Sequence, residues 1–178
     1  MCPEEKYNSD AWLRIRRLPY LIAMAMEGAG RSGIAGSASE RLAMAHGLAD
    51  GRTAFPDNPL IPAIVPEAEN ESQQLADTSA KHDEIMDCLV GMGIRKHSGL
   101  TDHIFRLIPI VLSDLKAHET PQTIEEYKTW TLSLAERISK SGKEGSVWGF
   151  GGEWFIEKEL DFFKKLYKDM MSLLCLNI

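Results

Sequence analysis

The sequence predicts an all-α fold, an irregular bundle of about six to seven helices, from two observations. Apolar residues recur at helical spacing along almost the whole chain, and no segment shows the alternation of apolar and polar residues that is typical of a strand. Glycines and prolines divide the chain into segments with the length of ordinary helices. Since 178 residues that are 44% hydrophobic suffice for one sizeable core, we expect a single helical domain over residues 1–178.

The first predicted helix begins at a cap on Ser9 or Asp10 and runs to about Met26, with its apolar residues on one stripe. Pro19 lies inside this segment. A proline removes one backbone donor and clashes with the preceding turn of a helix. We therefore expect Pro19 to kink this helix or to split it into two pieces.

The second predicted helix is short, with about twelve residues. Ser37 and Glu40 have the S-x-x-E form of a capping box at its start, and Asp50-Gly51 marks its end. The proline-rich run 51–66 follows as a long internal connection. Its LIPAIV stretch is apolar enough to pack on the core.

Two helices are predicted between this connection and residue 118. The first begins at Pro66 and runs to about Met92, and its first half is polar all round, so we expect its start to project from the body or to meet a partner. The second is strongly apolar and begins at a cap on Thr101 or Asp102. We expect it to be the central helix of the bundle and to bend at Pro109.

The last two predicted helices lie in the C-terminal third. Thr120-Pro121 is a cap followed by a proline in the first helical position, and the buried stripe that follows is Tyr127, Trp130, Leu134 and Ile138. The final helix begins near Gly152 or Glu153. Its main apolar stripe is Ile156, Leu160, Phe163, Tyr167, Met170 and Leu174, with Phe162, Leu166 and Leu173 as a second flank. A helix with so wide an apolar surface is central or shared with another subunit.

Composition and charge exclude some classes of function. The formal charge of −6 and the scattered distribution of the 20 Lys and Arg residues argue against nucleic-acid binding. No apolar stretch is long enough to span a membrane, and the polar N-terminus is no signal peptide, so we expect a cytoplasmic protein that is not associated with membranes. The three cysteines lack the spacing of a metal or disulfide motif, and we interpret them as free thiols.

Two glycine-punctuated segments are nearly alike and begin 112 residues apart, at Gly30 and Gly142. Each stands between two predicted helices, so we expect two similar helix–glycine loop–helix hairpins near the two ends of the chain. A glycine-rich loop that leads into a helix offers unpaired N–H groups to a phosphate or carboxylate. The candidate ligand-binding residues are Gly142, Lys143, Gly145, Trp148, Gly149, Phe150, Gly151, Gly152 and Trp154.

The alternative is that these loops are tight turns whose aromatic side chains close the end of the bundle. Neither loop has the spacing of a phosphate-binding loop or of a dinucleotide fingerprint, so the small-molecule ligand stays unknown and we expect no cofactor. Glu27 and Glu40 flank the first loop. Two carboxylates across a loop can act as acid and base, but the S-x-x-E box already gives Glu40 a capping role, and we favour that interpretation.

The second candidate site is a cluster of histidines and carboxylates, with His46, His82 and Asp83 as possible metal ligands. The His82-Asp83 doublet resembles that of HD-type metal phosphohydrolases. On that resemblance His46 would be the early ligand, and Asp102 or Asp114 the late one. The ordinary alternatives are a solvated helix face at His82 and a hydrogen-bonded core residue at His46.

A further resemblance concerns architecture alone. The helix–glycine turn–helix units are similar to TerB-like domains of tellurite-resistance proteins, whose turn has an acidic D-G-E form. Here the turns read G-R-S-G and G-K-E-G, so the metal role of that turn does not transfer.

Two hypotheses of function follow from the sequence. The first is a non-enzymatic helical interaction protein, a homo-oligomer that self-associates through its C-terminal helix. The alternative is a metal-dependent phosphohydrolase or small-anion-binding protein that uses the histidine and aspartate cluster or the glycine loops. No convergent catalytic set is found, which favours the first hypothesis.

Overall fold

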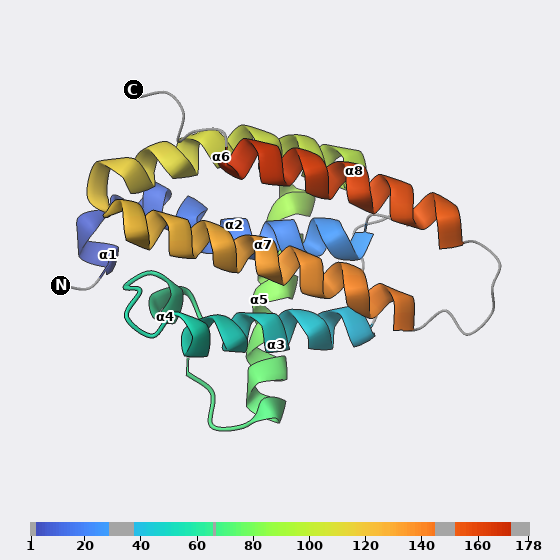
Figure 1. Cartoon of the computed structure of the whole chain (residues 1–178), viewed down its shortest axis with the longest axis horizontal. Coiled ribbons are helices and arrows are strands. Elements are labelled where there is room, and N and C mark those ends of the chain that lie inside the picture. Colours follow the sequence, from blue (N-terminus) through green and yellow to red (C-terminus); the bar gives the residue numbers. More distant parts are fainter. Residues whose placement is uncertain (1–2, 29–37, 66, 145–151, 172–178) are drawn as a thin grey trace.

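The computed structural model describes residues 3–28, 38–65, 67–144 and 152–171, and every regular element in these ranges is helical, as predicted (Figure 1). Six helices have 17 residues or more, and two are single turns. The elements are α1 (Pro3–Lys6), α2 (Ser9–Gly28), α3 (Ala38–Ala54), α4 (Ile61–Ile64), α5 (Glu71–Gly91), α6 (His97–His118), α7 (Pro121–Glu144) and α8 (Gly152–Met171). None of the helices in these ranges is both long and apolar enough to cross a membrane.

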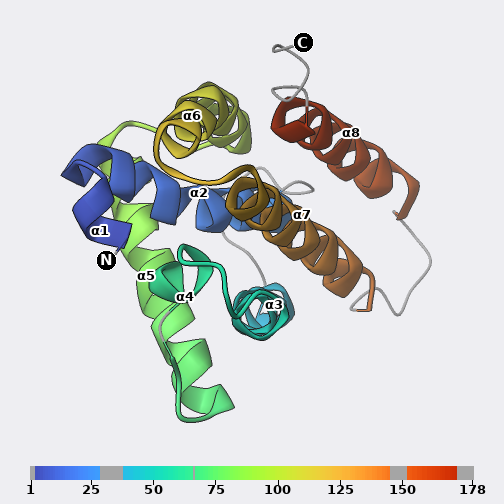
Figure 2. The ribbon, with the colours of Figure 1, turned by 60° about the vertical axis from the view of Figure 1, so that its left-hand side comes forward.

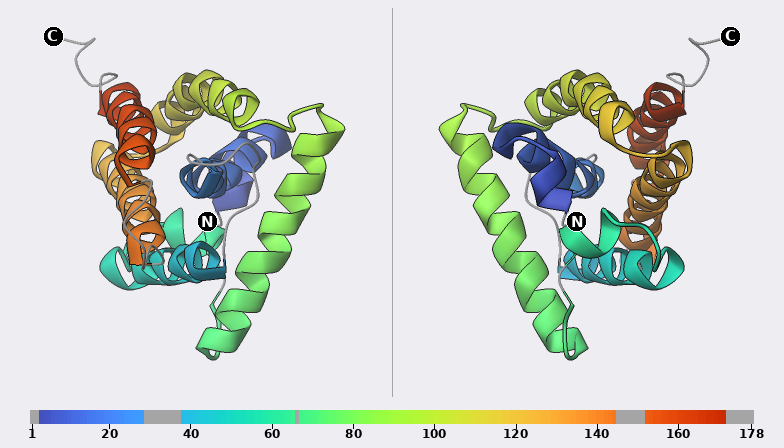
Figure 3. Two further views of the ribbon diagram at one scale, coloured as in Figure 1. Left: turned by 90° about the vertical axis from the view of Figure 1, so that its right-hand side faces the viewer. Right: turned by 90° about the vertical axis from the view of Figure 1, so that its left-hand side faces the viewer.

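The central helix is α2, which packs against α3, α5, α6 and α7 (Figure 3). Every residue from Leu18 to Glu27 is buried, so this part of α2 is enclosed on all sides. The prediction that α6 is the central helix is therefore wrong. Both α2 and α6 are rich in apolar residues. In α6 these residues form a stripe along one side of the helix, whereas in α2 they form an unbroken run, which is typical of a helix that is enclosed on all sides.

Pro19 does not split α2, which is one continuous helix in the structure. The helix begins one residue after Asn8, whose side chain accepts a hydrogen bond from the backbone N–H of Ala11 at 2.8 Å. Because Pro19 has no N–H, the carbonyl of Ile15 lacks its helical donor. The buried hydroxyl of Tyr127 on α7 donates to this oxygen at 2.8 Å, so a tertiary contact replaces the missing helical bond.

Helix α3 is longer than predicted, because Gly51 lies inside it and does not end it. A Cβ on Gly51 would lie 2.1 Å from Nε1 of Trp130, and one on Gly47 would lie 2.6 Å from Leu134. The indole N–H of Trp130 donates to the carbonyl of Gly47 at 3.3 Å. The two glycines thus let α7 approach the backbone of α3 closely.

The proline-rich connection packs on the core as predicted. Leu60, Ile61, Ile64 and Val65 are all buried, and the single turn α4 forms within this run. The buried side chain of Asn58 accepts from the backbone N–H of Leu60 at 3.0 Å and donates to the carbonyl of Thr123 on α7 at 3.1 Å. This asparagine joins the connection to the start of α7.

The boundaries of the next two helices differ from the predicted ones. Helix α5 begins at Glu71, with Asn70 as its cap, five residues after Pro66. Its buried face includes Gln74, Thr78 and His82, so the polar first half packs on α3 and α2 of the same chain. Helix α6 begins at His97 without a side-chain cap, before the predicted Thr101.

The last two helices begin where predicted, but the buried face of α8 differs. Thr120 caps α7, with its hydroxyl accepting from the N–H of Thr123 at 3.2 Å, and the four residues of the predicted α7 stripe are buried. On α8 the predicted flank is the side that packs on α6 and α7 (Figure 2). Phe162 and Leu166 of the predicted flank are buried together with Met170 of the predicted main stripe, whereas Leu160 and Tyr167 of that main stripe are 43% and 51% exposed.

Candidate functional site

The helix ends that border the two glycine segments lie at one end of the molecule. The end of α2, the start of α3, the end of α7 and the start of α8 all lie at the right-hand end of Figure 1. The helix ends that border these two segments, which begin 112 residues apart in the sequence, therefore lie on the same side of the body. Any site that uses both segments would be found here.

Most of the predicted ligand-binding residues lie outside the part that the structure describes. Gly145, Trp148, Gly149, Phe150 and Gly151 fall in the gap between α7 and α8, and Gly30 to Ser37 fall in the gap between α2 and α3. Four others are in helical backbone, at the end of α7 and the start of α8: Gly142, Lys143, Gly152 and Trp154. The ligand-binding role of these residues stays a prediction.

A groove of about 720 Å³ lies next to this end of the molecule, between α3 and α7. The residues that line it include His46, Asp50, Glu136, Arg137 and Lys140. Both cations are paired with acids, since Arg137 bonds Asp50 across the groove and the Lys140 ammonium lies 2.6 Å from Glu136. Among the described residues that line the groove, both Arg137 and Lys140 are thus paired with an acid, which leaves neither as a free cation for an anion.

His46 is not a core residue, because 41% of its side chain is exposed. Its Nε2 lies 2.8 Å from Oε1 of Glu71, the first residue of α5. The histidine therefore joins α3 to the start of α5 at the surface of the protein.

His82 lies in a different environment, between two carboxylates. Its side chain is only 3% exposed, and its two ring nitrogens face different acids. Nδ1 lies 3.2 Å from Oδ1 of Asp83, and Nε2 lies 3.5 Å from Oε2 of Glu27 near the end of α2. The Glu27 side chain is fully buried, and neither of its oxygens has a hydrogen bond.

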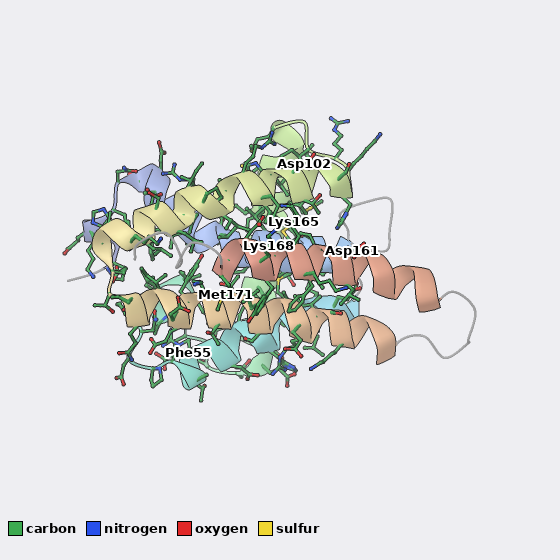
Figure 4. The ribbon with its side chains drawn as sticks, turned by 45° about the horizontal axis from the view of Figure 1, so that its top comes forward. Phe55, Asp102, Asp161, Lys165, Lys168 and Met171 are labelled. Carbon is green, nitrogen blue, oxygen red and sulfur yellow. The ribbon has the colours of Figure 1, made fainter. Side chains whose placement is uncertain are left out.

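The structure brings His82 and Asp83 together but leaves His46 apart from them. The partner of His46 is Glu71, which precedes His82 by 11 residues, or about 16 Å along a helix. Within the described ranges, no three His, Cys, Asp or Glu side chains converge as a metal centre would require. The late aspartates of the HD-type resemblance are also elsewhere, since Asp114 pairs with Arg14 at 3.0 Å and Asp102 is exposed on α6 (Figure 4).

The interface between α2 and α5 carries further charge. Arg17 on α2 donates to Glu84 at 2.9 Å and to the sulfur of Cys88 at 3.4 Å. Hydrogen bonds from Lys81 and Arg17 hold the pKa of Glu84 below its usual value. Burial, together with the charges of Asp77 and Glu84, raises the pKa of Tyr20 to about 12. Arg14 and Arg17 thus both make contacts within the chain.

His82 has two acidic neighbours, Asp83 and Glu27, and the sequence connects only Asp83 with it. A signal was present, because Glu27 ends a run of seven apolar residues, Tyr20 to Met26, in a helix that is enclosed on all sides. An ionisable residue in such a run is buried by its neighbours and needs a partner. Sequence alone could not show that this partner is on α5.

Comparison with protein-family models, with curated proteins and with solved structures finds no match for this chain. The function of the chain is therefore inferred from the geometry of its own residues.

Proposed function

We propose that the chain is a non-enzymatic helical interaction protein that self-associates through the outer face of α8. The observation that carries this proposal is an apolar stripe on α8 that stays partly exposed beside the face that packs on α6 and α7. Its members are spaced by three or four residues: Leu160 and Tyr167 are exposed, and Phe163 and Met171 are half-buried because they also pack against the core. Such spacing places side chains on one side of a helix.

The stripe suits a second copy of the same helix in antiparallel orientation. In a two-fold interface that crosses between Phe163 and Lys164, Leu160 of one copy would lie opposite Tyr167 of the other. Asp161 and Lys168 are exposed beside the stripe on opposite sides of this crossing point, so the part of one copy that carries Asp161 would face the part of the other that carries Lys168 (Figure 4). Opposite charges that flank an apolar seam select partner and orientation in paired helices. The two-fold axis would make both contacts twice.

The test is the mass of the protein in solution at micromolar concentration, measured by sedimentation or light scattering. We expect a species of twice the chain mass of 19.9 kDa. Replacing both Leu160 and Tyr167 by glutamate should give the monomer, because four buried charges would face each other in the dimer.

A matched control is Ile110→Glu on α6, since Ile110 is 45% exposed and lies outside the stripe. This variant should keep the mass of the wild-type protein. A wild-type protein that stays monomeric over the whole concentration range would refute the proposal, and so would equal dissociation by the control.

A further inference from the structure

A small pocket of about 220 Å³ lies in the corner where α6 runs into α7, at the left-hand end of Figure 1. Three buried residues form its inner wall: Leu112, Ile124 and Lys128. Lys116 and Pro121 are exposed and stand at its mouth. The pocket shares no residue with the groove between α3 and α7, which lies toward the other end of the molecule.

Lys128 brings a positive charge to the inner wall of this pocket. Its side chain is only 2% exposed, although lysine is almost never buried to this degree unless it is paired. The ammonium donates to Oε1 of Glu125 at 2.7 Å, and because both residues line the pocket, this ion pair borders it. An ammonium has three N–H donors. Among the described residues only Glu125 accepts from it, which leaves two donors of a buried cation without an acceptor.

The second acid that lines the pocket is compensated from elsewhere. The side chain of Glu119 is 2% exposed, and its two oxygens lie 3.2 and 3.1 Å from the ammonium of Lys6 on α1. The hydroxyl of Tyr7 also donates to Oε1 of Glu119, at 2.9 Å. Of the two acids in the lining, Glu125 is therefore the one that competes for Lys128, and its side chain is 36% exposed.

The remaining walls of the pocket are apolar. Leu112 and Ile124 offer aliphatic side chains, and the methylene stems of the two lysines add to them. An apolar cavity of about 150 Å³ holds one benzene molecule. A volume of about 220 Å³ is thus sufficient for a ring together with one carboxylate. Apolar walls with a few polar groups that fix orientation are typical of small-molecule sites.

We propose that this pocket binds a small monocarboxylate whose apolar part is about as large as a benzene ring. The carboxylate accepts hydrogen bonds from the two remaining donors of Lys128, and the apolar part contacts Leu112 and Ile124. Hydrogen bonds between ions are stronger than those between neutral groups, and more so where water is scarce. The inference is independent of self-association through α8, because the residues that line the pocket belong to α6, α7 and the turn between them.

The experiment is a titration of the full-length protein with benzoate, followed by NMR amide shifts and by the melting temperature. We expect saturation at one benzoate per chain, with the largest shifts around Ile124 and Lys128, and a rise in melting temperature. Benzamide has the ring without the charge, and acetate has the charge without the ring. Each should bind about 10-fold more weakly than benzoate, or weaker still.

Two variants test the role of the ion pair. Lys128→Met keeps an unbranched side chain but removes the ammonium, so it should abolish the preference for benzoate over benzamide. Glu125→Gln removes the competing negative charge and should raise the affinity for benzoate several-fold. The second variant keeps the proposal testable if the first fails to fold, since Glu125 is partly exposed.

The matched control is Lys140→Met. Lys140 lies on the same helix and is also paired with a glutamate, but its side chain is 70% exposed and lines the groove between α3 and α7. This variant should bind benzoate as the wild-type protein does.

Four results would overturn the proposal. The first is a wild-type protein that shows no saturable binding of benzoate. The second is equal affinity of the wild-type protein for benzoate and benzamide, which would leave an apolar cavity without a role for Lys128. The third is equal weakening in Lys128→Met and Lys140→Met, which would trace binding to the overall charge. The fourth is weaker binding of benzoate by a folded Glu125→Gln variant.

Discussion

Helices α5 and α7 pack against the same two helices, α2 and α3, but by different means. Helix α7 buries large apolar side chains, among them Trp130 and Leu134, and approaches the backbone of α3 at two glycines. Helix α5 meets α2 and α3 with a face that includes Gln74, Thr78 and His82, and its edges carry ion pairs.

The apolar interfaces of α7 contribute mainly to the stability of the fold, whereas the polar interface of α5 contributes mainly to one specific arrangement of the helices. Burial of apolar area stabilises a fold in proportion to the area, and the close approach of α7 makes its contacts sensitive to volume. Polar and charged contacts contribute little when they are exposed, but a buried polar group fixes one arrangement because its loss leaves a partner unsatisfied. We therefore expect substitutions at the α7 interfaces to destabilise the fold most, and those at exposed pairs on the α5 side least.

The largest effect is expected for Gly51→Ala, at the interface of α3 with α7. The new Cβ would overlap the Trp130 indole, since the built Cβ lies 2.1 Å from its Nε1. The rigid ring must shift and give up its bond to Gly47, which should lower the free energy of unfolding by about 3 kcal/mol in chemical denaturation. Gly91→Ala is the control, because a Cβ there meets nothing within 4 Å. A loss in both variants alike would contradict this account.

The next effect is expected for Tyr127→Phe, at the interface of α2 with α7. Without the hydroxyl, the buried carbonyl of Ile15 has no donor, because Pro19 offers none. We expect a loss of about 2 kcal/mol in the free energy of unfolding. In a Pro19→Ala background the alanine N–H can bond Ile15, so the same substitution should cost less. Equal costs in both backgrounds would show that the hydroxyl does not replace the missing helical bond.

A smaller effect is expected at high pH from Tyr20, at the interface of α2 with α5. Its pKa is raised to about 12 from the usual tyrosine value of 10.0, so the folded state holds the phenol proton more tightly than the unfolded state. The stabilisation is complete below pH 10 and is lost as the pH rises toward 12. The ionisation of Tyr20 alone should lower the free energy of unfolding by about 1 kcal/mol between neutral pH and pH 11.

The measurement is the free energy of unfolding of wild-type and Tyr20→Phe proteins from neutral pH to pH 11. The phenylalanine variant should lose less stability over this range. Tyr7 and Tyr127 also have raised pKa values through burial, so part of the loss should persist in the variant. Parallel curves would show that Tyr20 does not contribute.

The smallest effect is expected for His46→Ala, at the exposed contact of α3 with α5. The His46 and Glu71 side chains are 41% and 69% exposed, and such pairs contribute little. We expect a change of about 0.5 kcal/mol or less in the free energy of unfolding. If His46→Ala lost as much stability as Gly51→Ala, exposed ion pairs on α5 would matter as much as the apolar interfaces of α7, which would contradict the comparison.

The sequence predicts most of what depends on local patterns. The helical class, the start of α7 at Thr120-Pro121 and the packing of residues 60–65 all follow from nearby residues, and the structure confirms them. The errors arise where a distant residue decides the outcome. Gly51 is predicted to end a helix, but it lies inside α3, where the absence of a side chain makes room for Trp130. Pro19 is predicted to kink or split a helix, but α2 is continuous and Tyr127 supplies the missing donor.

The candidate site follows the same rule. His82 and Asp83 are found from their adjacent positions, because a doublet is a local pattern. The contact of His82 with Glu27 joins two helices that are far apart in the sequence, and no spacing predicts it. The polar face of α5 is missed for a related reason, since Gln74 and Thr78 are buried although their residue types are commonly exposed.

The bond between Tyr127 and Ile15 also bears on the order in which the chain folds. The donor lies 112 residues after the acceptor, so the contact can form only after most of the chain has been made and α7 has docked. Before that step the segment around Pro19 has the interrupted helix that its own sequence dictates. A continuous α2 is therefore a late product of folding, and a peptide of residues 9–28 alone should melt first at the turn between Ile15 and Pro19.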